Sequence, residues 1–501
     1  METKLKELKE RLIEAKNLRS AVELLYWDQT TYMPPGGASA RARQIATLEK
    51  LAHEKFIDPQ IGKLLKELKP YEESLPYDSN EASLIRVTWR EYERAVKVPP
   101  SFQAELSEHL SEAYEVWVKA RPENDFAKVK PYLEKTLDLS QKLANFFPGY
   151  EHIADPLIDF QDYGMKTSMI LALFKELREQ LVPIVQKITS QKAADDSCLR
   201  KRFPEEKQLA FGEEVVKRLG YDFQRGRQDK SPHPFTTEFS IGDVRITTRV
   251  KENDLTDALF STIHEAGHAV YEQGSSMDLE GTILAGGTSS GVHESQSRMW
   301  ENIVGRSRGF WKFFYPRLQE IFPEQLKSVP LDTFYRAINK VQRSLIRTDA
   351  DEVTYNLHIM IRFELELELL EGKLAISDLP EAWRERYKSD LGIEPPDDKD
   401  GVMQDVHWYG SHIGGVFQCY TLGNIMSGQF YEAALKAHPE IPSEIEKGKF
   451  DPLHNWLKEN IYQHGSKYTA SELIKRVTGK ELTIEPYINY LRTKYGELYN
   501  L

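Results

Sequence analysis

The sequence predicts a mainly α-helical protein that carries one small β-sheet. Apolar residues recur at steps of three and four through most of the 501 residues, a pattern typical of helices with one buried face. One stretch, residues 235–250, is instead rich in β-branched residues. No internal repeat, low-complexity tail or long Pro/Gly-rich linker divides the chain. We therefore expect residues 1–501 to form a single large domain.

The predicted helices are spread along the whole chain. The first runs from residue 5 to residue 25, with a core-facing stripe of Leu5, Leu8, Leu12, Ala15, Leu18, Val22 and Leu25. Further helices are expected near Phe102–Lys119, Ile170–Ser190, Thr333–Arg347, Glu352–Leu370, Ser471–Thr478 and Tyr487–Tyr495. The segment Trp27–Gly37 ends in a Pro-Pro-Gly-Gly turn. Residues 1–80 are therefore either a plain helical segment or the rim or lid of a site.

Composition narrows the function classes. The chain has 66 basic and 78 acidic side chains, a net charge of −12, so it lacks the positive charge that nucleic acids and anionic membranes attract. Cys198 and Cys419 lie far apart without a metal-binding or redox spacing, which predicts reduced thiols. The charged N-terminus lacks a signal-peptide core, and no apolar run is long enough to span a bilayer. We expect a cytoplasmic protein.

The β-branched segment Phe235–Val250 is interpreted as a hairpin with its turn at Gly242-Asp243. An exposed strand edge can pair with the backbone of an extended peptide, which gives affinity without side-chain preference. Arg245, within this segment, is a candidate for holding a nearby carboxylate. A structural salt bridge is the alternative interpretation of this arginine.

The strongest motif follows the hairpin, in the run His264-Glu265-Ala-Gly-His268. It lies in a predicted helix whose apolar stripe contains Leu255, Leu259, Ile263, Ala266 and Val270. His264 and His268 are one turn apart, so both imidazoles project from one face and can bind a single zinc ion. Catalytic zinc keeps an open position for water, lowers its pKa and polarises a substrate carbonyl. Glu265 would accept the proton of that water.

A third metal ligand is expected downstream. In His293-Glu294-Ser-Gln, Glu294 follows His268 with 25 residues between them, as in peptidases that bind zinc through two histidines and a glutamate. His293 is the competing ligand, and a role in orienting a ligand or a structural role are its other interpretations. The extended metzincin signature is excluded because Tyr271 and Gly274 occupy two of its required positions.

Taken together, the motifs resemble one family, the carboxypeptidase Taq family of gluzincin-type zinc metallocarboxypeptidases. Their order along the chain, from near residue 26 to about residue 424, covers most of the sequence. The matching runs are Tyr26-Trp-Asp-Gln29, Tyr32-Met-Pro34, His233-Pro-Phe235, Asp243-Val-Arg-Ile-Thr247, His264-Glu-Ala-Gly-His268, His293-Glu-Ser-Gln296, Ile346-Arg-Thr-Asp-Ala-Asp351 and Gly401-Val-Met-Gln-Asp-Val-His-Trp408. The resemblance implies a helical, saddle-like body with a deep active-site groove, the metal at its bottom and a short sheet on one wall. It also implies a homodimer.

Further site residues are predicted from these motifs. An enzyme that acts at C-termini must bind a free carboxylate, which a planar guanidinium does well, so Arg347 is the first candidate. Ion pairs with Asp349, Asp351 or Glu352 are its structural alternative. His407 either supports a ligand or lines the groove. His233 either narrows the closed end of the groove or belongs to a simple turn.

Two residues are candidates for stabilising the oxyanion of the tetrahedral intermediate. The run from His412 to Tyr420 is similar to a stretch of thimet oligopeptidase and its relatives, in which a histidine and a tyrosine hydrogen-bond that oxyanion. By this resemblance His412 and Tyr420 take these roles. Core aromatic packing is the alternative for Tyr420.

The sequence thus predicts a metallocarboxypeptidase that hydrolyses the C-terminal bond of peptides with a free C-terminus. One zinc ion per subunit is expected, although cobalt or manganese can occupy the same ligands. An endo-oligopeptidase on the same scaffold is the first alternative. A non-catalytic peptide-binding protein is the second, and the presence of Glu265 argues against it.

Overall fold

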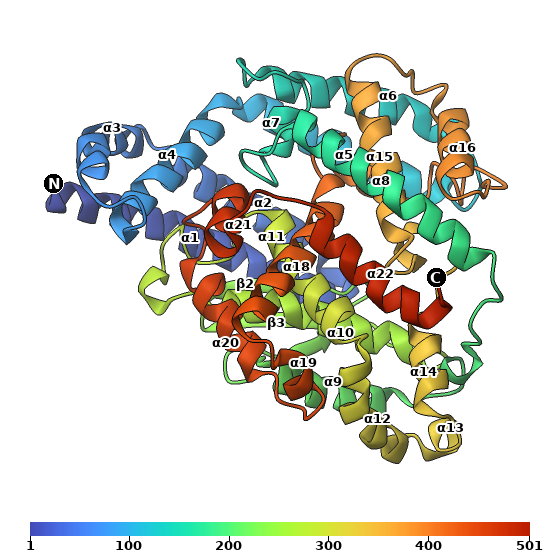
Figure 1. The fold of residues 1–501 in the computed structure, drawn as a ribbon. Helices are drawn as coiled ribbons and strands as arrows, with labels where there is room; N and C mark the ends of the chain where they lie inside the picture. The colour runs from blue at the N-terminus through green and yellow to red at the C-terminus, as the bar shows by residue number, and fades with distance from the viewer. The chain divides into compact units, whose positions relative to one another are not determined.

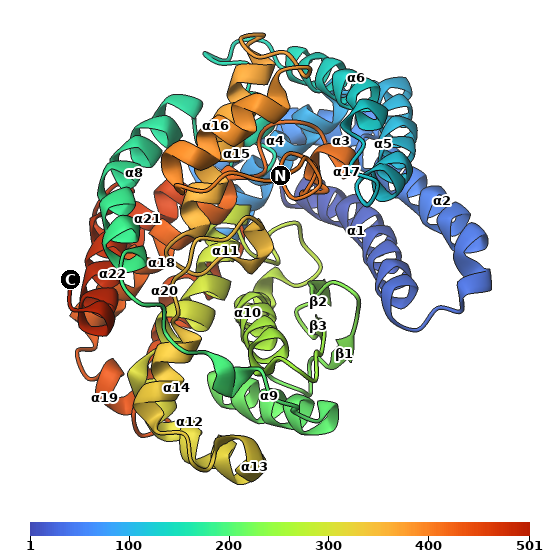
Figure 2. The ribbon, with the colours of Figure 1, turned by 90° about the vertical axis from the view of Figure 1, so that its right-hand side faces the viewer.

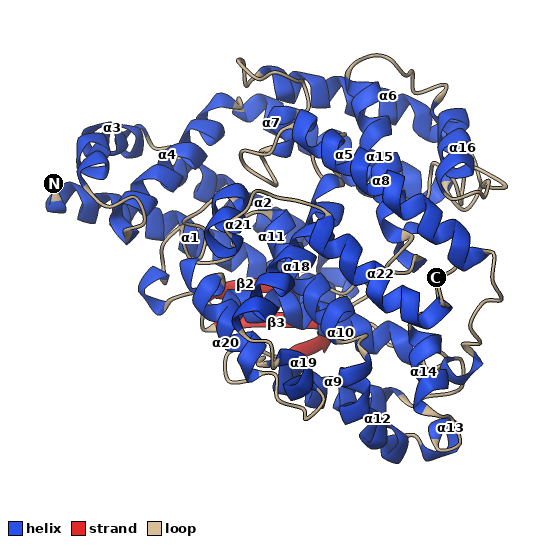
Figure 3. Cartoon of the chain, in the orientation of Figure 1, coloured by secondary structure: helices blue, strands red, loops and turns tan.

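A computed structural model describes residues 1–501 and is mainly helical with one three-stranded sheet, as the sequence predicts (Figure 3). The chain folds into two units, each assembled from three separate segments. Unit 1 contains residues 1–96, 195–338 and 430–481, and unit 2 contains residues 97–194, 339–429 and 482–501. None of the helices combines the length and the apolar character needed to cross a bilayer.

Unit 1 holds the sheet and the first helices of the chain (Figure 1). Its helices are α1 (Glu2–Thr31), α2 (Ala38–Phe56), α3 (Pro59–Ser74), α4 (Asn80–Lys97), α9 (Glu205–Leu219), α10 (Leu255–Gln273), α11 (Ser290–Arg298), α12 (Arg308–Ile321), α13 (Pro323–Leu326), α14 (Leu331–Ile338), α19 (Ile441–Ile445), α20 (Asp451–Asn460) and α21 (Ala470–Thr478). Short turns of helix are η1 (Pro35–Gly37), η2 (Ser197–Leu199), η3 (Met277–Leu279), η4 (Met299–Val304) and η6 (Tyr462–His464).

Unit 2 is entirely helical. Its elements are α5 (Pro100–Ala120), α6 (Phe126–Asn145), α7 (Asp155–Ile158), α8 (Thr167–Thr189), η5 (Arg347–Asp349), α15 (Tyr355–Leu370), α16 (Leu379–Asp390), α17 (His407–Gly410) and α22 (Glu485–Tyr499). Helix α18 (Gln418–Ala437) begins in unit 2 and ends in unit 1.

The N-terminal helix is anchored by the apolar stripe that the sequence predicts. Five members of the predicted stripe are buried and the other two are half-buried. The first four turns of α1 pack with α3 and α4 in one apolar cluster, which includes Leu8, Ile61, Leu65 and Ile85. Because α1 also lies along α2 and contacts β2, it links the N-terminal helices to the sheet (Figure 2).

The sheet contains the predicted hairpin and one additional strand. Strands β2 (Thr236–Ser240) and β3 (Asp243–Thr248) pair antiparallel, and β1 (Gln228–Lys230) pairs parallel to β3, so the order is β1-β3-β2. The turn falls at Ile241-Gly242, one residue before the predicted position. Helix α10 packs against β2 and β3, which places the sheet beside the helix of the histidine motif (Figure 2).

One predicted helix is wrong over half its length. The helix expected at Thr333–Arg347 ends at Ile338. Beyond that point, side chains from remote segments accept the backbone N–H groups: Tyr499 binds that of Val341, and Gln404 binds that of Arg347. Because these side chains replace the intrahelical acceptors, the apolar periodicity does not produce a helix here.

Candidate metal centre

Helix α10 brings His264 and His268 onto one face. The Asp254 side chain caps the helix by accepting the backbone N–H of Thr256 at 2.9 Å. The five apolar residues of the predicted stripe are all buried, which fixes the rotation of the helix. The two imidazole rings lie 5.0 Å apart and nearly perpendicular, so their nitrogens can converge on one point.

Helix α11 brings Glu294 to the two histidines because it packs very closely against α10. A Cβ atom at Gly267 would lie 2.6 Å from the Cα of Ser297, so only glycine allows this approach of the two helices. The Ser289 side chain caps α11 by accepting the backbone N–H of Val292 at 3.1 Å. The glycine between the two histidines thus has a packing role that the motif alone does not reveal.

The three predicted ligands form a compact donor set. His264, His268 and Glu294 each offer one ligand atom, and these atoms lie within 4.8 Å of one another. The Oε2 atom of Glu294 is 3.6 Å from Nε2 of His264 and 3.5 Å from Nε2 of His268. Two imidazole nitrogens and one carboxylate oxygen suit zinc. The residues present therefore fit a metal ion of this kind.

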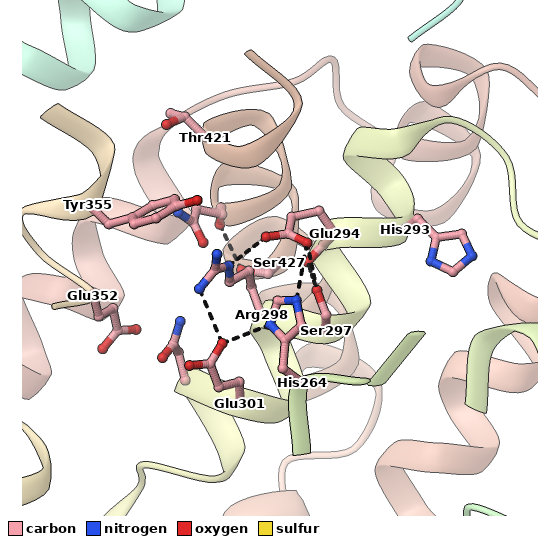
Figure 4. Close-up of polar contacts among 12 residues, drawn as sticks. His264, His293, Glu294, Ser297, Arg298, Glu301, Glu352, Tyr355, Thr421 and Ser427 are labelled. Carbon is pink, nitrogen blue, oxygen red and sulfur yellow. Dashed lines mark hydrogen bonds and ion pairs between the residues drawn. The ribbon is translucent and has the colours of Figure 1, made fainter. Parts of the chain in front are cut away.

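Glu294 is held with one carboxylate oxygen directed at the histidines. Its Oε1 atom accepts the Nε–H of Arg298 at 2.7 Å, and Ser297 donates to Oε2 at 3.0 Å (Figure 4). Burial alone would raise the pKa of Glu294, but Arg298 and His264 outweigh it and hold the pKa well below its ordinary value. The side chain is therefore an anion, as a metal ligand must be.

His264 is oriented by a second carboxylate on the same helical stripe as Glu294. Nδ1 of His264 lies 2.9 Å from Oε2 of Glu301, which also accepts from Arg298 at 3.2 Å (Figure 4). Burial opposes the charge of Glu301, yet Arg298 and the hydrogen bond with His264 lower its pKa to about 2. A carboxylate on Nδ1 fixes the tautomer that leaves the Nε2 lone pair for a metal.

His268 is supported differently, through a second imidazole. Its Nδ1 lies 2.7 Å from Nδ1 of His293, whose Nε2 contacts Glu272. Burial lowers the pKa of His268 to about 4, so its imidazole is neutral near pH 7 and keeps a lone pair for a metal. His293 therefore stands behind a candidate ligand, which is one of the interpretations drawn from the sequence.

Glu265 lies buried on the face of α10 that packs against the sheet. Its Oε2 accepts the hydroxyl hydrogen of Thr236 on β2 at 2.7 Å, and the same hydroxyl lies 2.9 Å from the Glu265 carbonyl. Burial raises the pKa of Glu265, although His264 and Thr236 oppose the shift. A carboxylate whose pKa is raised toward neutrality is suited to exchanging protons with a substrate.

In unit 2, Arg347 lies in a buried ion-pair cluster. Its guanidinium donates to both oxygens of Asp405, at 2.6 Å from Nη2, and to the hydroxyl of Tyr355 at 3.1 Å. Asp405 also binds the fully buried Arg362. The near neighbours considered from sequence are not its partners; Asp405 lies 58 positions away. Two guanidiniums share one carboxylate, so this group carries excess positive charge.

His407 and Tyr420 belong to the same cluster. Nδ1 of His407 lies 3.2 Å from Asp405, and Nε2 lies 3.2 Å from the Tyr420 hydroxyl. His412 lies elsewhere in unit 2, with its ring 6.1 Å from that of Phe160 and its buried Nε2 without a hydrogen-bond partner. Burial lowers the pKa of His412 to about 4. The histidine beside Tyr420 is thus His407.

Arg245 and His233 lie at the sheet of unit 1. Arg245 pairs with Asp243 through two hydrogen bonds of 2.8 Å, and its guanidinium stacks on Trp27 at 4.4 Å. These contacts favour the structural salt bridge considered above. His233 is exposed in the loop before β2, where its carbonyl accepts the hydroxyl of Ser231 at 2.6 Å.

Comparison with known proteins identifies the family. Residues 7–495 match the carboxypeptidase Taq (M32) metallopeptidase family. The chain belongs to this family. Thermostable carboxypeptidase 1 of Thermus thermophilus is 42% identical over 498 residues, which cover 97% of both chains. Carboxypeptidase 1 of Bacillus subtilis is 38% identical over 99% of both chains. The crystal structure of the M32 carboxypeptidase from Deinococcus radiodurans has a TM-score of 0.96 and 49% identity over 100% of both chains.

The predicted family and enzyme class are therefore confirmed, and the protein is an M32 metallocarboxypeptidase. Sequence reasoning missed Thr236, Glu272, Arg298 and Glu301 around the candidate metal centre of unit 1, and Arg362 in the ion-pair cluster of unit 2. A signal existed for two of them, because Glu294, Arg298 and Glu301 are four and seven residues apart and so share one helical face. Glu272 follows His268 by four residues, so it lies one turn further along the same helical face. No spacing in the sequence links Thr236 to the histidines.

Proposed function

We propose that this M32 carboxypeptidase removes residues from the C-terminus of peptides at a zinc centre held by His264, His268 and Glu294. The observation that carries the proposal is the convergence of three ligand atoms within 4.8 Å. Glu301 and His293 already engage the far sides of the two imidazoles, which leaves both Nε2 atoms facing Glu294. Such pre-orientation is typical of metal sites.

Zinc bound at these ligands would supply a polarised carbonyl and a more acidic water. Glu265 would take the proton of the attacking water and return it to the leaving amine. Its hydrogen bond with Thr236 holds one carboxylate oxygen and leaves the other for this transfer. The raised pKa of the buried Glu265 favours both directions of proton exchange.

The cluster around Asp405 is the proposed site for the substrate's terminal carboxylate. Arg347 and Arg362 share this single acid, so the group can accept one more anion. Arg347 remains the candidate that binds the carboxylate, since Arg362 is fully buried. Tyr420 remains the candidate for hydrogen-bonding the oxyanion, and the geometry favours His407 over His412 as its partner.

Several predictions from sequence remain proposals. They are one catalytic domain, zinc as the metal, a homodimer and a cytoplasmic location. The two cysteines are free and buried, which supports a reducing compartment. For Arg245, the contacts described above support a structural role more than contact with substrate. The roles of His233 and His412 that the sequence suggests stay proposals.

The decisive experiment is digestion of a peptide with a free C-terminus and of the same peptide with a C-terminal amide. Mass spectrometry should show a ladder of single-residue losses from the free acid and little cleavage of the amide. Removal of the metal with a chelator should stop the reaction, and zinc should restore it. Efficient internal cleavage of the amidated peptide would instead establish the endo-oligopeptidase alternative.

A further inference from the structure

A chain of hydrogen-bonded side chains extends behind His268 into the interior of unit 1. It begins with the 2.7 Å contact between the Nδ1 atoms of His268 and His293. It continues from Nε2 of His293 to Glu272 on α10. The Glu238 carboxyl group of β2 lies beside Glu272, since a Cβ at Gly286 would be 3.1 Å from an oxygen of each. Helices α10 and α11 therefore both contribute to holding a single candidate ligand.

The donor and acceptor of each contact follow from the ends of the chain. If Nε2 of His268 binds a metal, its Nδ1 carries hydrogen and must donate. Nδ1 of His293 must then accept, so the hydrogen of His293 sits on Nε2, where Glu272 accepts it. In the opposite tautomer of His293, two N–H groups would meet head-on at 2.7 Å and displace the His268 ring.

Glu272 is built to keep this acceptor role. Its carboxylate accepts the backbone N–H of Gly287 at 3.2 Å. Burial alone would raise the pKa of Glu272, but the neighbouring His293 and the hydrogen bond from Gly287 outweigh burial, so the pKa lies below its ordinary value. Burial and the charge of Glu272 raise the pKa of the neighbouring Glu238.

We propose that Glu272 is a positioning residue of the metal centre, which acts through His293 to hold the His268 ring in its metal-binding tautomer and orientation. The inference rests on the proposed zinc site. His264 obtains the same support directly from Glu301, so the two ligands differ in how many groups must be in place. Loss of an outer partner of this kind typically weakens metal affinity about 10–100-fold.

The test measures the Kd for Zn²⁺ by competition with a chelator. Glu272→Gln removes the charge that fixes the His293 tautomer and should raise the Kd about 10–100-fold. Glu280→Gln is the matched control, because Glu280 is an exposed acid of the same unit that accepts the backbone N–H of Ile241.

Two substitutions of His293 test the same inference, so the conclusion does not depend on whether Glu272→Gln folds correctly. Asn can accept directly from His268 and has no ring tautomer, so His293→Asn should keep zinc affinity and make a further Glu272→Gln change silent. His293→Phe offers no acceptor and should lose affinity about as much as Glu272→Gln. A double-mutant cycle between positions 272 and 293 therefore shows strong coupling if the chain acts as proposed.

The inference would be overturned if His293→Phe left zinc affinity unchanged. It would also be overturned if Glu272→Gln reduced zinc affinity equally in the wild-type and His293→Asn backgrounds. The d–d spectrum of the Co²⁺-loaded protein provides a second readout, since a displaced imidazole changes the ligand field. A wild-type protein that binds no zinc would overturn the proposed metal centre and this inference together. Zinc binding that is lost in His268→Ala, with an unaffected His293→Phe, would overturn the inference alone.

Discussion

At the residue scale, Glu265 and Glu294 show how one buried site gives two glutamates opposite properties. Burial by itself favours the protonated form of both carboxyl groups. The nearby Arg298 and His264 outweigh burial at Glu294, so the pKa of Glu294 is lowered, whereas the pKa of Glu265 is raised. Glu294 is therefore held as an anion, whereas the pKa of Glu265 stays above its ordinary value. This separation supports the assignment of Glu294 as ligand and Glu265 as base.

Replacing Glu265 with Gln should remove turnover and keep the metal. An amide cannot accept a proton from water, and general acid–base catalysis contributes about 10²–10⁴-fold to rate. We expect kcat on a free-acid peptide to fall by at least about 100-fold. Zinc content, measured on the same preparation, should equal that of wild type. Retained turnover with full zinc content would contradict the role of Glu265.

Replacing Arg347 with Lys tests recognition of the terminal carboxylate. Lysine keeps the positive charge but loses the planar pair of donors. A charge-assisted hydrogen bond is worth about 1.5–3 kcal/mol, so kcat/KM on free-acid peptides should fall about 10–100-fold. Zinc Kd serves as the control and should not change. Wild-type kinetics in this variant would remove Arg347 from the substrate site.

At the scale of elements, the candidate metal centre depends on the contact between α10 and α11. Glu294 lies on α11 and reaches the histidines of α10 because Gly267 allows the helix backbones to meet. The same helical stripe carries Arg298 and, in the π-helical turn η4, Glu301. Helix packing at one glycine thus sets the position of a candidate ligand and of the groups around it.

Gly267→Ala should therefore damage the site although Ala is a better helix former. The added Cβ would lie 2.6 Å from Cα of Ser297 and 2.9 Å from the carbonyl oxygen of Gln296. We expect a loss of about 1–3 kcal/mol in the free energy of unfolding and weaker zinc binding. The matched control is Gly212→Ala on α9, whose Cβ meets the Thr262 side chain at a tolerable 3.4 Å. Equal behaviour of both variants in thermal unfolding and zinc titration would argue against this account.

The sequence predicted these elements better than the contacts that complete the site. The stripe of α10, the hairpin and the histidine pair follow from periods of 3.6 and 2 residues, which are local properties. Thr236 could not be assigned, because its contact joins segments that no local period relates. Glu272 lies one turn after His268 on α10, but its contact with His293 on α11 follows from no local period. Arg347 illustrates the same limit: its partner is Asp405 rather than any of its near acidic neighbours. The early end of α14 also results from remote side chains.

At the scale of the whole molecule, buried acids link stability to pH. Glu366 on α15 is fully buried, accepts the indole N–H of Trp408 at 2.7 Å, and has its pKa raised by burial to about 8. In an unfolded chain the pKa of Glu is about 4.3. Between these values the folded protein holds a proton that the unfolded chain has lost. Stability from this group is therefore complete below about pH 4.3 and declines as pH rises toward 8.

Glu366→Gln should remove this dependence, since Gln keeps an acceptor for Trp408 and does not ionise. We expect the Tm of the variant, relative to wild type, to increase between pH 5.5 and pH 8. The exposed Glu10 of α1 provides a control, and Glu10→Gln should show no such trend. Thermal unfolding of the three proteins at both pH values is the measurement. A relative Tm that is flat or falls with pH would show that Glu366 is ionised in the native protein.

The interleaving of the two units has a consequence for how the protein forms in the cell. Tyr462, in the last segment of unit 1, packs on Tyr271 of the histidine helix and donates to Gln296 beside Glu294. A ribosome that has made both histidines and Glu294 must still synthesise more than a hundred residues before this buttress exists. The nascent chain thus passes through a long interval in which the candidate metal ligands are present without this contact. Truncations before Tyr462 would remove the contact from the histidine helix and from Gln296.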